Sequence, residues 1–216
     1  MTVLAGSVWT IVVAAGSGRR FGADKLSVAL SGDETVFDLS VAEAVHHSDG
    51  TVVVVAGDSP LLLGKPAAGV RFVAGGGSRS ASARNGLAAV PDDTAIVLIH
   101  DAARPLADAG VYGRVIDAVR GGAAAVIPTI PVVDTIRAVD GGVVDRDALR
   151  AVQTPQGFLA SVLREAHATQ NEATDDAALV EALGHEVVLV DGDVRNLKIT
   201  RPADIAMARA LIDEPG

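Results

Sequence analysis

Residues Trp9 to Lys25 read WTIVVAAGSGRRFGADK and join a short apolar run to a loop of small and basic residues. The run Trp9–Val13 predicts a strand, because a continuous apolar run of this length is typical of a buried strand. Glycines in the loop let the backbone approach an anion and point its N–H groups at it. Arg19, Arg20 and Lys25 add the positive charge that a triphosphate requires. The stretch predicts a phosphate-binding loop; the alternative is a plain glycine-rich turn with solvated basic residues.

The spacing of the glycines excludes two common nucleotide-binding motifs. A Walker A loop requires Gly-x-x-x-x-Gly-Lys-Ser/Thr, but Gly18 and Gly22 are too close together and no Gly-Lys-Ser/Thr follows. A dinucleotide fingerprint requires Gly-x-Gly-x-x-Gly, and here the third glycine comes one residue late. Asp58 follows the next apolar run about twice as far along the chain as the roughly 20 residues typical of a ribose-binding acid. The loop therefore favours a mononucleoside triphosphate over NAD, and an NAD-dependent oxidoreductase is disfavoured.

Apolar runs alternate with helical patterns along the whole chain. The predicted strands are Trp9–Val13, Thr51–Ala56, Val70–Ala74, Thr94–Ile99, Ala123–Ile127 and Glu186–Val190. The predicted helices are Thr35–His47, Arg79–Val90, Ala107–Arg120, Phe158–Thr169, Asp175–Leu183 and Pro202–Ile212. Such alternation predicts an α/β fold, with a mostly parallel sheet and helices on both faces. Ligands of such sheets bind beyond the carboxyl ends of the strands.

One segment interrupts this alternation. Residues 132–153 hold short alternating runs around Asp140-Gly141-Gly142, a pattern that predicts a β-hairpin. We expect residues 1–216 to form a single domain in which residues 131–155 are a small β-arm subdomain. A hairpin that leaves the body of a protein has exposed edges, and such edges usually dock on something. The segment therefore suggests a dimerisation arm, with a simple surface excursion as the alternative.

Composition limits the class of protein. The net charge of −9 argues against a nucleic-acid binder, which would need a broad basic face. The chain has no cysteine, which excludes disulfides, thiolate metal sites and a cysteine nucleophile. Residues 1–8 lack the basic region of a signal peptide, and no apolar stretch reaches the roughly 18 residues that span a membrane. We therefore expect a soluble cytoplasmic protein without nucleic-acid or membrane partners.

Polar residues with chemical potential follow the predicted strand Thr94–Ile99. Asp101 is expected to point into the crevice and to help hold Mg²⁺, which takes carboxylate, water and phosphate oxygens. Arg104 is a candidate for pairing with a phosphate or for orienting Asp101; the alternative is an internal Asp101–Arg104 pair that shapes the turn. His100 is a weak candidate for acid–base chemistry, since a histidine at a strand end is more often structural.

Two further segments are candidates for binding anions. The turn Gly75–Ser78 joins a strand to a helix that carries Ser82, and it suits an anion or a base edge unless it is an ordinary Ser-capped helix start. Lys198 is one of only three lysines in a chain rich in arginine. A lysine kept in such a background suggests a position where a compact ammonium matters, and a solvated surface lysine is the alternative.

In their order along the chain these motifs resemble those of the cytidylyltransferases that join CTP to a sugar-alcohol phosphate. The resemblance runs from near residue 9 to near residue 212 and is closest to the members that act on 2-C-methyl-D-erythritol 4-phosphate in non-mevalonate isoprenoid biosynthesis. The matched segments are residues 14–20 with Lys25, 75–82, 100–105, 134–135, Arg146, 154–156, 174–175 and 196–204. Some relatives have Asp where Gly77 stands, which leaves the selection of cytosine less secure than triphosphate binding.

The resemblance implies a Rossmann-like nucleotidyltransferase fold and a role for each matched residue. The implied CTP-binding residues are Ala14, Ala15, Gly16, Gly18, Gly75, Gly76, Ser82, Asp101 and Ala102. The implied catalytic clamp is Arg20, Lys25 and Lys198. The implied acceptor-binding residues are Arg104, Thr135, Arg146 and Thr154. Asp101 would be associated with Mg²⁺ or another divalent cation, and Arg146 would serve the neighbouring site of a homodimer in which the arms exchange.

Other activities stay open as alternatives. The nearest is a cytidylyltransferase for ribitol 5-phosphate or another polyol phosphate. A uridylyl- or guanylyltransferase of the same fold is disfavoured by the full set of motifs. A non-catalytic nucleotide-binding regulator is disfavoured because a binding module has no need for Arg20, Lys25, Asp101 and Lys198 together.

Overall fold

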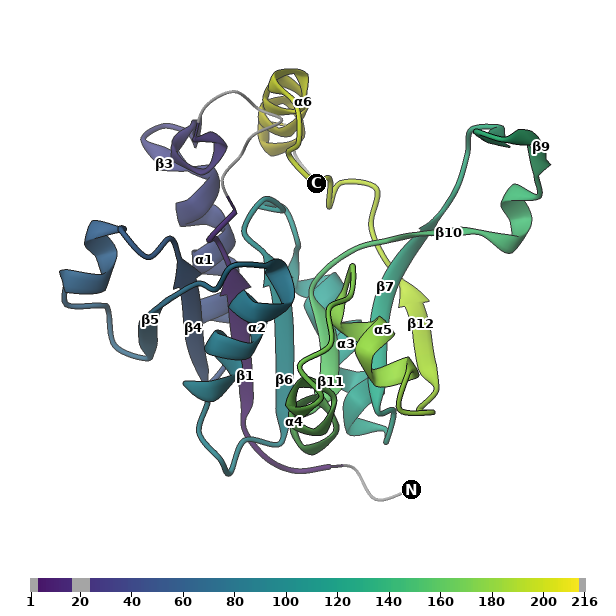
Figure 1. The fold of residues 1–216 in the computed structure, drawn as a ribbon. Coiled ribbons are helices and arrows are strands. Elements are labelled where there is room, and N and C mark those ends of the chain that lie inside the picture. Colours follow the sequence, from purple (N-terminus) through teal and green to yellow (C-terminus); the bar gives the residue numbers. More distant parts are fainter. Residues whose placement is uncertain (1–3, 17–23, 214–216) are drawn as a thin grey trace.

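A computed structural model describes residues 4–16 and 24–213 of the chain. Its centre is an eight-stranded sheet in the order β10-β7-β11-β6-β1-β4-β5, with β12 pairing onto β7 (Figure 1). The strands are β1 (Val8–Val13), β4 (Gly50–Val55), β5 (Val70–Ala74), β6 (Ile96–Asp101), β7 (Ala125–Pro131), β10 (Arg150–Val152), β11 (Gln156–Leu159) and β12 (Val187–Asp191). Strands β5, β4, β1 and β6 are parallel neighbours, and β12 is parallel to β7. The predicted α/β fold with a mostly parallel sheet is confirmed.

Helices cover both faces of this sheet, because side chains alternate between the faces along each strand. Ile11 of β1 packs in one core cluster with residues of α2 (Arg79–Ala88), α4 (Ala160–Ala168) and α5 (Asp176–Glu181). The next residue, Val12, packs on the opposite face with α1 (Val36–His46). On that second face α3 (Ala109–Arg120) packs against β6, β7 and β12.

The last helix, α6 (Pro202–Asp213), lies outside these two layers (Figure 1). It packs on the short strand β2 (Ala29–Ser31), which pairs with β3 (Glu34–Thr35). A small cluster of buried apolar side chains fastens it: Leu30, Val36, Ile199, Ile205 and Ala208. This packing places the segment just before α6 beside the start of α1.

Strand β11 was not expected, because the sequence pattern predicts a helix from Phe158. Residues Gln156–Leu159 instead run antiparallel between β6 and β7, and α4 begins only at Ala160. Phe158 is fully buried in the core between the two neighbouring strands. A Cβ atom on Gly157 would lie 2.5 Å from Cγ1 of Val115, so the missing side chain lets α3 lie directly on this strand.

Strand β6 also differs from its prediction. It begins at Ile96 instead of Thr94 and continues to Asp101. The extension arises because His100 and Asp101 pair in register with Val12 and Val13 of β1. Asp101 is therefore held by the sheet itself and is not part of the following turn.

Helices α2 and α4 each contribute an arginine that donates hydrogen bonds to carbonyl groups at the carboxyl end of the other helix. Arg164 of α4 donates to the carbonyl oxygens of Leu87, Val90 and Pro91 at 3.5, 3.4 and 2.8 Å. Arg84 of α2 donates to the carbonyl oxygen of His167 at 3.2 Å. The last carbonyl groups of a helix lack hydrogen-bond partners within it, and these guanidinium groups supply them. Their positive charge also interacts favourably with the negative end of the helix dipole.

The predicted hairpin is confirmed. Strands β8 (Ile136–Ala138) and β9 (Gly141–Val144) pair antiparallel and lie apart from the main sheet, at the end of an arm (Figure 1). Gly141 and Gly142 have φ angles of 125° and 74°, conformations that glycine adopts without strain. The base of the arm is the pairing of β7 with β10, where Pro131 faces Arg150.

In the part of the chain that the structure describes, none of the helices combines the length and the apolar character needed to cross a membrane.

Candidate active site

The predicted site residues gather at one edge of the sheet. Strands β1, β4, β5 and β6 are parallel, so their carboxyl ends meet there. The segment 14–16 follows β1, the turn 75–77 follows β5, and Asp101 ends β6. Strand β11 runs the other way, so Thr154 reaches the same edge just before that strand begins. Four segments from distant parts of the sequence therefore line one end of the sheet.

A narrow cradle forms where the chain leaves β1 and β5. A Cβ atom on Gly75 would collide with Cβ of Ala15 and lie 3.0 Å from Oγ of Ser82. The buried Ser82 hydroxyl accepts from the amide of Gly76 at 3.1 Å and donates to the carbonyl of Ser78 at 2.8 Å. Gly75, Gly76, Ala15 and Ser82 are thus brought together, and the role of Ser82 in the structure is to shape this turn. Their contact with CTP stays a prediction.

The segments that flank this cradle are fixed through their backbones. The amide of Ala14 donates to the carbonyl of Val54 at 2.7 Å. Ala102 is buried, its amide donates to the carbonyl of Val13 at 3.2 Å, and its carbonyl accepts from Oγ of Ser40 at 2.7 Å. The structure thus gives Ala102 a packing role beside the site, and the predicted CTP contacts of Ala14 and Ala102 stay predictions. Gly16 is exposed, and no atom of the described residues lies within 4 Å of a Cβ built on it.

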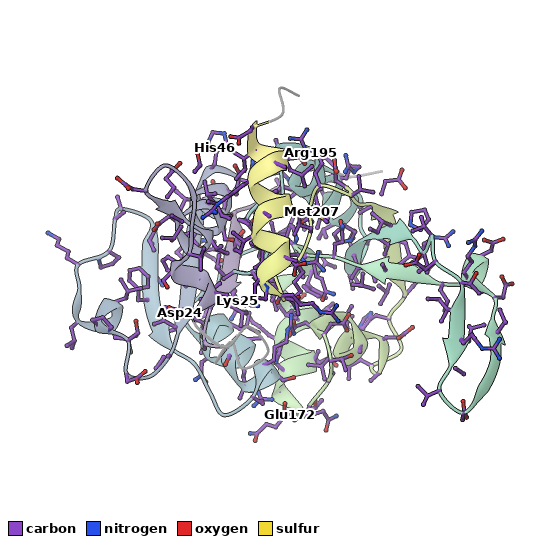
Figure 2. All side chains as sticks on the ribbon, turned by 90° about the horizontal axis from the view of Figure 1, so that it is seen from above. Asp24, Lys25, His46, Glu172, Arg195 and Met207 are labelled. Carbon is purple, nitrogen blue, oxygen red and sulfur yellow. The ribbon has the colours of Figure 1, made fainter. Side chains whose placement is uncertain are left out.

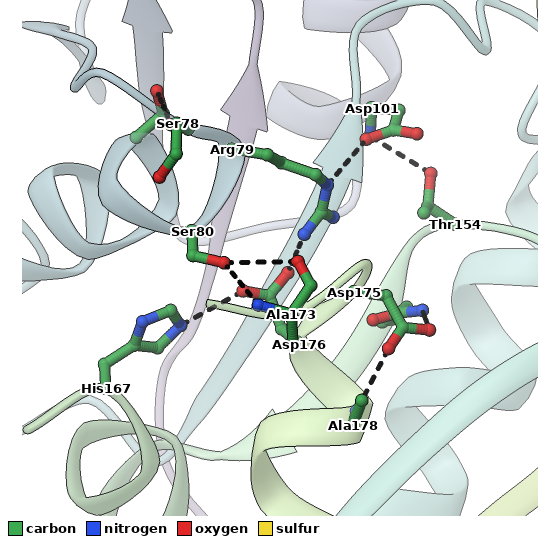
Figure 3. Close-up of polar contacts among 12 residues, drawn as sticks. Ser78, Arg79, Ser80, Asp101, Thr154, His167, Ala173, Asp175, Asp176 and Ala178 are labelled. Atoms are coloured by element: carbon green, nitrogen blue, oxygen red, sulfur yellow. Dashed lines mark hydrogen bonds and ion pairs between the residues drawn. The ribbon is translucent and has the colours of Figure 1, made fainter. Parts of the chain in front are cut away.

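Asp101 is the electrostatic centre of the site, and Figure 3 shows its contact with Arg79. Its Oδ2 atom accepts from Nζ of Lys198 at 2.6 Å, and its Oδ1 atom lies 3.7 Å from Nε of Arg79. Burial alone would raise the pKa of Asp101, but the charges of Lys198 and Arg79 outweigh burial and lower it to about 2. The carboxylate is therefore ionised throughout the physiological pH range. The side chain of Lys198 is 41% exposed, so it does lie at the surface, but its ammonium is paired with Asp101 and is not merely solvated.

A chain of hydrogen bonds through Thr154 and His100 fixes the backbone of Asp101. The amide of Asp101 donates to Oγ1 of Thr154 at 3.0 Å, and Oγ1 of Thr154 lies 3.1 Å from Nδ1 of His100. Nε2 of His100 lies 3.1 Å from the carbonyl oxygen of Arg104, which can only accept a hydrogen bond. The hydrogen of His100 is thus on Nε2, and Nδ1 accepts from the Thr154 hydroxyl. Burial lowers the pKa of His100 to about 4, so this histidine is neutral and structural.

Arg104 does not pair with Asp101 in the described residues. Its guanidinium donates to the carbonyl oxygens of Asn196 at 2.7 Å and Val152 at 3.1 Å. The alternative of an internal Asp101–Arg104 ion pair is therefore wrong, because the arginine reaches over to the segments before β11 and α6. Its predicted contact with a phosphate stays a prediction, as does that of Thr154, whose hydroxyl is already engaged by Asp101 and His100.

Lys25 approaches the same site from the first loop. Asp24 caps the short 3-10 helix that begins at Lys25, and Nζ of Lys25 donates to the carbonyl of Ile199 at 2.8 Å. Figure 2 shows Lys25 close to the start of α6. Because Ile199 directly follows Lys198, two of the three predicted clamp residues converge on one short segment. Arg20 and Gly18 lie outside the described residues.

Thr135 and Arg146 are not brought to this edge within one chain. Both are exposed on the arm, and Nη1 of Arg146 donates to the carbonyl of Val133 at 2.6 Å. Figure 1 shows the arm extending away from the edge where β1 and β6 end. Their predicted acceptor-binding role stays a prediction that would require a second chain.

The sequence patterns missed an ion pair beneath the site, between the partly exposed Arg79 and the buried Asp176. Nη1 of Arg79 lies 2.6 Å from Oδ2 of Asp176, and Oδ1 of Asp176 lies 3.1 Å from Nε2 of His167. Asp176 is fully buried. The only signal was positional, because Arg79 and Asp176 are each the first residue of a helix and follow the capping residues Ser78 and Asp175.

The site can hold a divalent cation only if the substrate supplies most of the ligands of that cation. Among the described residues no group of three or more His, Cys, Asp or Glu side chains could hold a metal ion. Asp101 offers one ionised carboxylate, which Lys198 and Arg79 already contact. Mg²⁺ often takes one or two carboxylates and draws its other ligands from phosphates and water. The residues therefore suit a cation that arrives with a triphosphate.

Comparison with known proteins identifies the family. A sequence profile described as "IspD: 2-C-methyl-D-erythritol 4-phosphate cytidylyltransferase" matches residues 8–214. The 2-C-methyl-D-erythritol 4-phosphate cytidylyltransferase of Nocardia farcinica is 45% identical over 221 residues, covering 96% of this chain and 95% of that protein. A bifunctional IspD/IspF enzyme of Solidesulfovibrio magneticus is 43% identical over 223 residues, covering 93% of this chain and 56% of that longer protein. The crystal structure of 2-C-methyl-D-erythritol 4-phosphate cytidylyltransferase from Thermus thermophilus matches with a TM-score of 0.80 and 36% identity, covering 96% of this chain and 98% of that chain. This chain belongs to the 2-C-methyl-D-erythritol 4-phosphate cytidylyltransferase family.

Proposed function

We propose that this chain transfers the cytidylyl group of CTP to 2-C-methyl-D-erythritol 4-phosphate and releases pyrophosphate. The observation that carries the proposal is the Lys198–Asp101 contact of 2.6 Å at the carboxyl edge of the sheet, next to the turn of Gly75 against Ala15. An ionised carboxylate with a fixed ammonium beside a close-packed glycine turn suits a bound triphosphate. Relatives named for this reaction cover almost the whole chain.

The reaction needs positioning more than acid–base chemistry. A phosphate oxygen of the acceptor forms a bond to the α-phosphorus of CTP. The bond from that phosphorus to the oxygen bridging the β-phosphate breaks, and pyrophosphate leaves with the electron pair. The attacking group is already an anion, so no proton needs to be removed. Lys25 and Lys198 would stabilise the charge that builds up on the phosphate oxygens, and the neutral His100 would only hold the backbone.

We propose that a divalent cation, Mg²⁺ by preference, binds together with CTP. Asp101 would be its protein ligand, since it is the carboxylate at this edge whose pKa lies at about 2. When bound, the cation would neutralise part of the charge on the phosphate oxygens. Lys198 and Arg79 would keep Asp101 ionised and oriented for this contact.

We also propose that the enzyme works as a homodimer in the cytoplasm, where CTP is available. The support is the arm, which extends away from the main sheet (Figure 1) and on which Thr135 and Arg146 are exposed. Val139 and Val143 on the hairpin are 108% and 64% exposed, an apolar surface that a second copy would cover. In this arrangement Arg146 would bind the acceptor phosphate in the neighbouring site.

The decisive experiment measures pyrophosphate release from the purified chain with CTP and Mg²⁺. One arm supplies 2-C-methyl-D-erythritol 4-phosphate and the other ribitol 5-phosphate. Release with the first acceptor alone is the expected result. Release with ribitol 5-phosphate alone would keep the reaction type and overturn the acceptor. Absence of release with both acceptors, from protein that still binds CTP, would overturn the proposed activity.

A further inference from the structure

The carboxylate of Asp176 lies in the interior, next to the active site but out of contact with solvent (Figure 3). Arg79 binds one of its oxygens through Nη1 at 2.6 Å, and His167 binds the other through Nε2 at 3.1 Å. Asp101, at the site, contacts the same arginine through a different nitrogen, Nε, at 3.7 Å. Arg79 therefore bridges a buried carboxylate and a carboxylate of the site.

Stability alone is a poor reason for such an arrangement. Removing a charged pair from water costs several kcal/mol for each ion, and replacing buried ion pairs by apolar side chains is often neutral or stabilising. The side chain of Arg79 is still 27% exposed, so its charge has some contact with water even without Asp176. The buried carboxylate must then be explained by what it does to the position of Arg79.

The distances from Arg79 to the two carboxylates show that its guanidinium lies closer to Asp176 than to Asp101. The short contact, 2.6 Å, is made with Asp176, and the long one, 3.7 Å, is made with Asp101. Asp101 makes its own short contact, 2.6 Å, with Lys198. Without the charge of Asp176, the guanidinium would be free to close on Asp101 and compete with Lys198 for it. Asp176 thus keeps the two cations on different carboxylates.

We propose that Asp176 is a positioning residue for the reaction, which acts through Arg79 to keep Asp101 paired with Lys198 in the geometry that the bound triphosphate meets. Asp176 touches neither substrate, and its effect passes through two side-chain contacts. The inference rests on the proposed cytidylyl transfer, because the readout is turnover of CTP.

A competing explanation is that Asp176 only fastens α2 to α5. Ser80 already joins α2 to the loop just before α5, because its hydroxyl donates to the carbonyl of Ala173 at 3.3 Å and accepts from its amide at 3.2 Å. Ser80 is buried one residue after Arg79 and makes no contact with Asp101. It therefore offers a matched control for damage to the junction without loss of the charge pair.

The experiment uses the full chain and three variants, Asp176→Asn, Arg79→Gln and the two combined. Wild-type turnover of CTP with 2-C-methyl-D-erythritol 4-phosphate is measured first; its absence overturns the proposed function and this inference together. We expect Asp176→Asn to lower kcat about 10- to 100-fold, the range seen when partners that orient functional ligands are removed, with little change in the KM for CTP. We expect the double variant to be no slower than Arg79→Gln alone, because Asp176 then has nothing to position.

Ser80→Ala is expected to lower the thermal midpoint and to leave kcat within about twofold of wild type. Arg79→Lys tests the idea without altering Asp176: the charge stays, but one ammonium cannot reach both carboxylates as the two guanidinium nitrogens do, so kcat should fall as in Arg79→Gln. Wild-type kcat in folded Asp176→Asn or in Arg79→Lys overturns the inference. So do effects of Asp176→Asn and Arg79→Gln that multiply, or an equal loss of kcat in Ser80→Ala.

Discussion

The ammonium of Lys25 donates a hydrogen bond to the carbonyl oxygen of Ile199 at 2.8 Å, across a separation of 174 positions in the sequence. This contact ties the end of the first loop to the segment that carries Lys198. Lys198 in turn binds Asp101. Two lysines from opposite ends of the chain therefore share one short piece of backbone at the site.

We expect Lys25→Ala to lower kcat about 100-fold or more, because removing one preorganised donor to developing charge has an effect of that order. The free energy of unfolding should fall by about 1.5–3 kcal/mol, the scale of a hydrogen bond to a charged group. Steady-state pyrophosphate release and urea unfolding measure the two effects. Lys65→Ala is the matched control, since Lys65 is exposed on a loop. An unchanged kcat in Lys25→Ala would remove Lys25 from the clamp.

Gly75→Ala tests the cradle beside β5. The added methyl group would collide with Ala15 and crowd Ser82, so the segment after β1 must shift. We expect a higher KM for CTP and a loss of about 1–3 kcal/mol in the free energy of unfolding, as for other overpacked sites. Gly113→Ala in α3, where a Cβ meets no atom within 4 Å, should be neutral or up to about 1 kcal/mol stabilising. Calorimetric titration measures the affinity for CTP, and an unchanged affinity in Gly75→Ala would contradict the prediction.

Stability should fall in mildly acidic solution because of His100. Burial lowers its pKa from 6.5 to about 4, so between these values the unfolded chain binds a proton that the folded chain does not. The contribution of His100 is complete above about pH 6.5 and is lost as the pH falls to about 4, a change on the order of 3 kcal/mol. Asp101, with its pKa lowered from 3.8 to about 2, loses its contribution only at lower pH.

Urea unfolding at a series of pH values measures this slope. His100→Gln removes the titrating ring and should flatten the curve between pH 6.5 and 4, while lowering stability at neutral pH through the lost bonds to Thr154 and Arg104. The same slope in wild type and variant would show that another group governs acid stability.

The hydrogen bonds of Arg84 and Arg164 between α2 and α4 should affect stability but not catalysis. Arg164→Ala leaves the carbonyl groups of Leu87, Val90 and Pro91 without their donor. We expect the free energy of unfolding to fall by about 1–3 kcal/mol, with kcat unchanged. Thermal unfolding is the measurement, and Lys65→Ala, at an exposed position of a loop, is the control. A loss no larger than in that control would show that solvent satisfies the helix end equally well.

The sequence predicts the sheet well where strands are continuous apolar runs. The six predicted strands are all present, and the predicted run Val70–Ala74 matches β5 residue for residue. Strand β11 escapes the pattern, because Gln156-Gly157-Phe158-Leu159 is neither alternating nor a continuous run. Its pairing depends on the two neighbours that it enters between, β6 and β7, and no local pattern contains that information.

The site shows the same division. Lys198 was found through composition, and Asp101 through its place at a strand end. The Arg79–Asp176 pair spans 97 positions, as does the Lys198–Asp101 pair, so neither contact can be deduced from spacing. Arg104 was misplaced for a related reason: the nearest acid in sequence is Asp101, but the folded chain offers it the carbonyl groups of Val152 and Asn196.

Pro131 faces Arg150 in the register of β7 and β10, so the chain returns to its point of departure before it continues to Thr154. Residues 132–149 therefore form a loop whose two ends are held together by the pairing of β7 with β10. The entropy of closing such a loop changes only slowly with its length. Insertions or deletions near the turn at Gly141 are therefore decoupled from the sheet. The length of the hairpin can thus change without altering the geometry of Asp101 at the site.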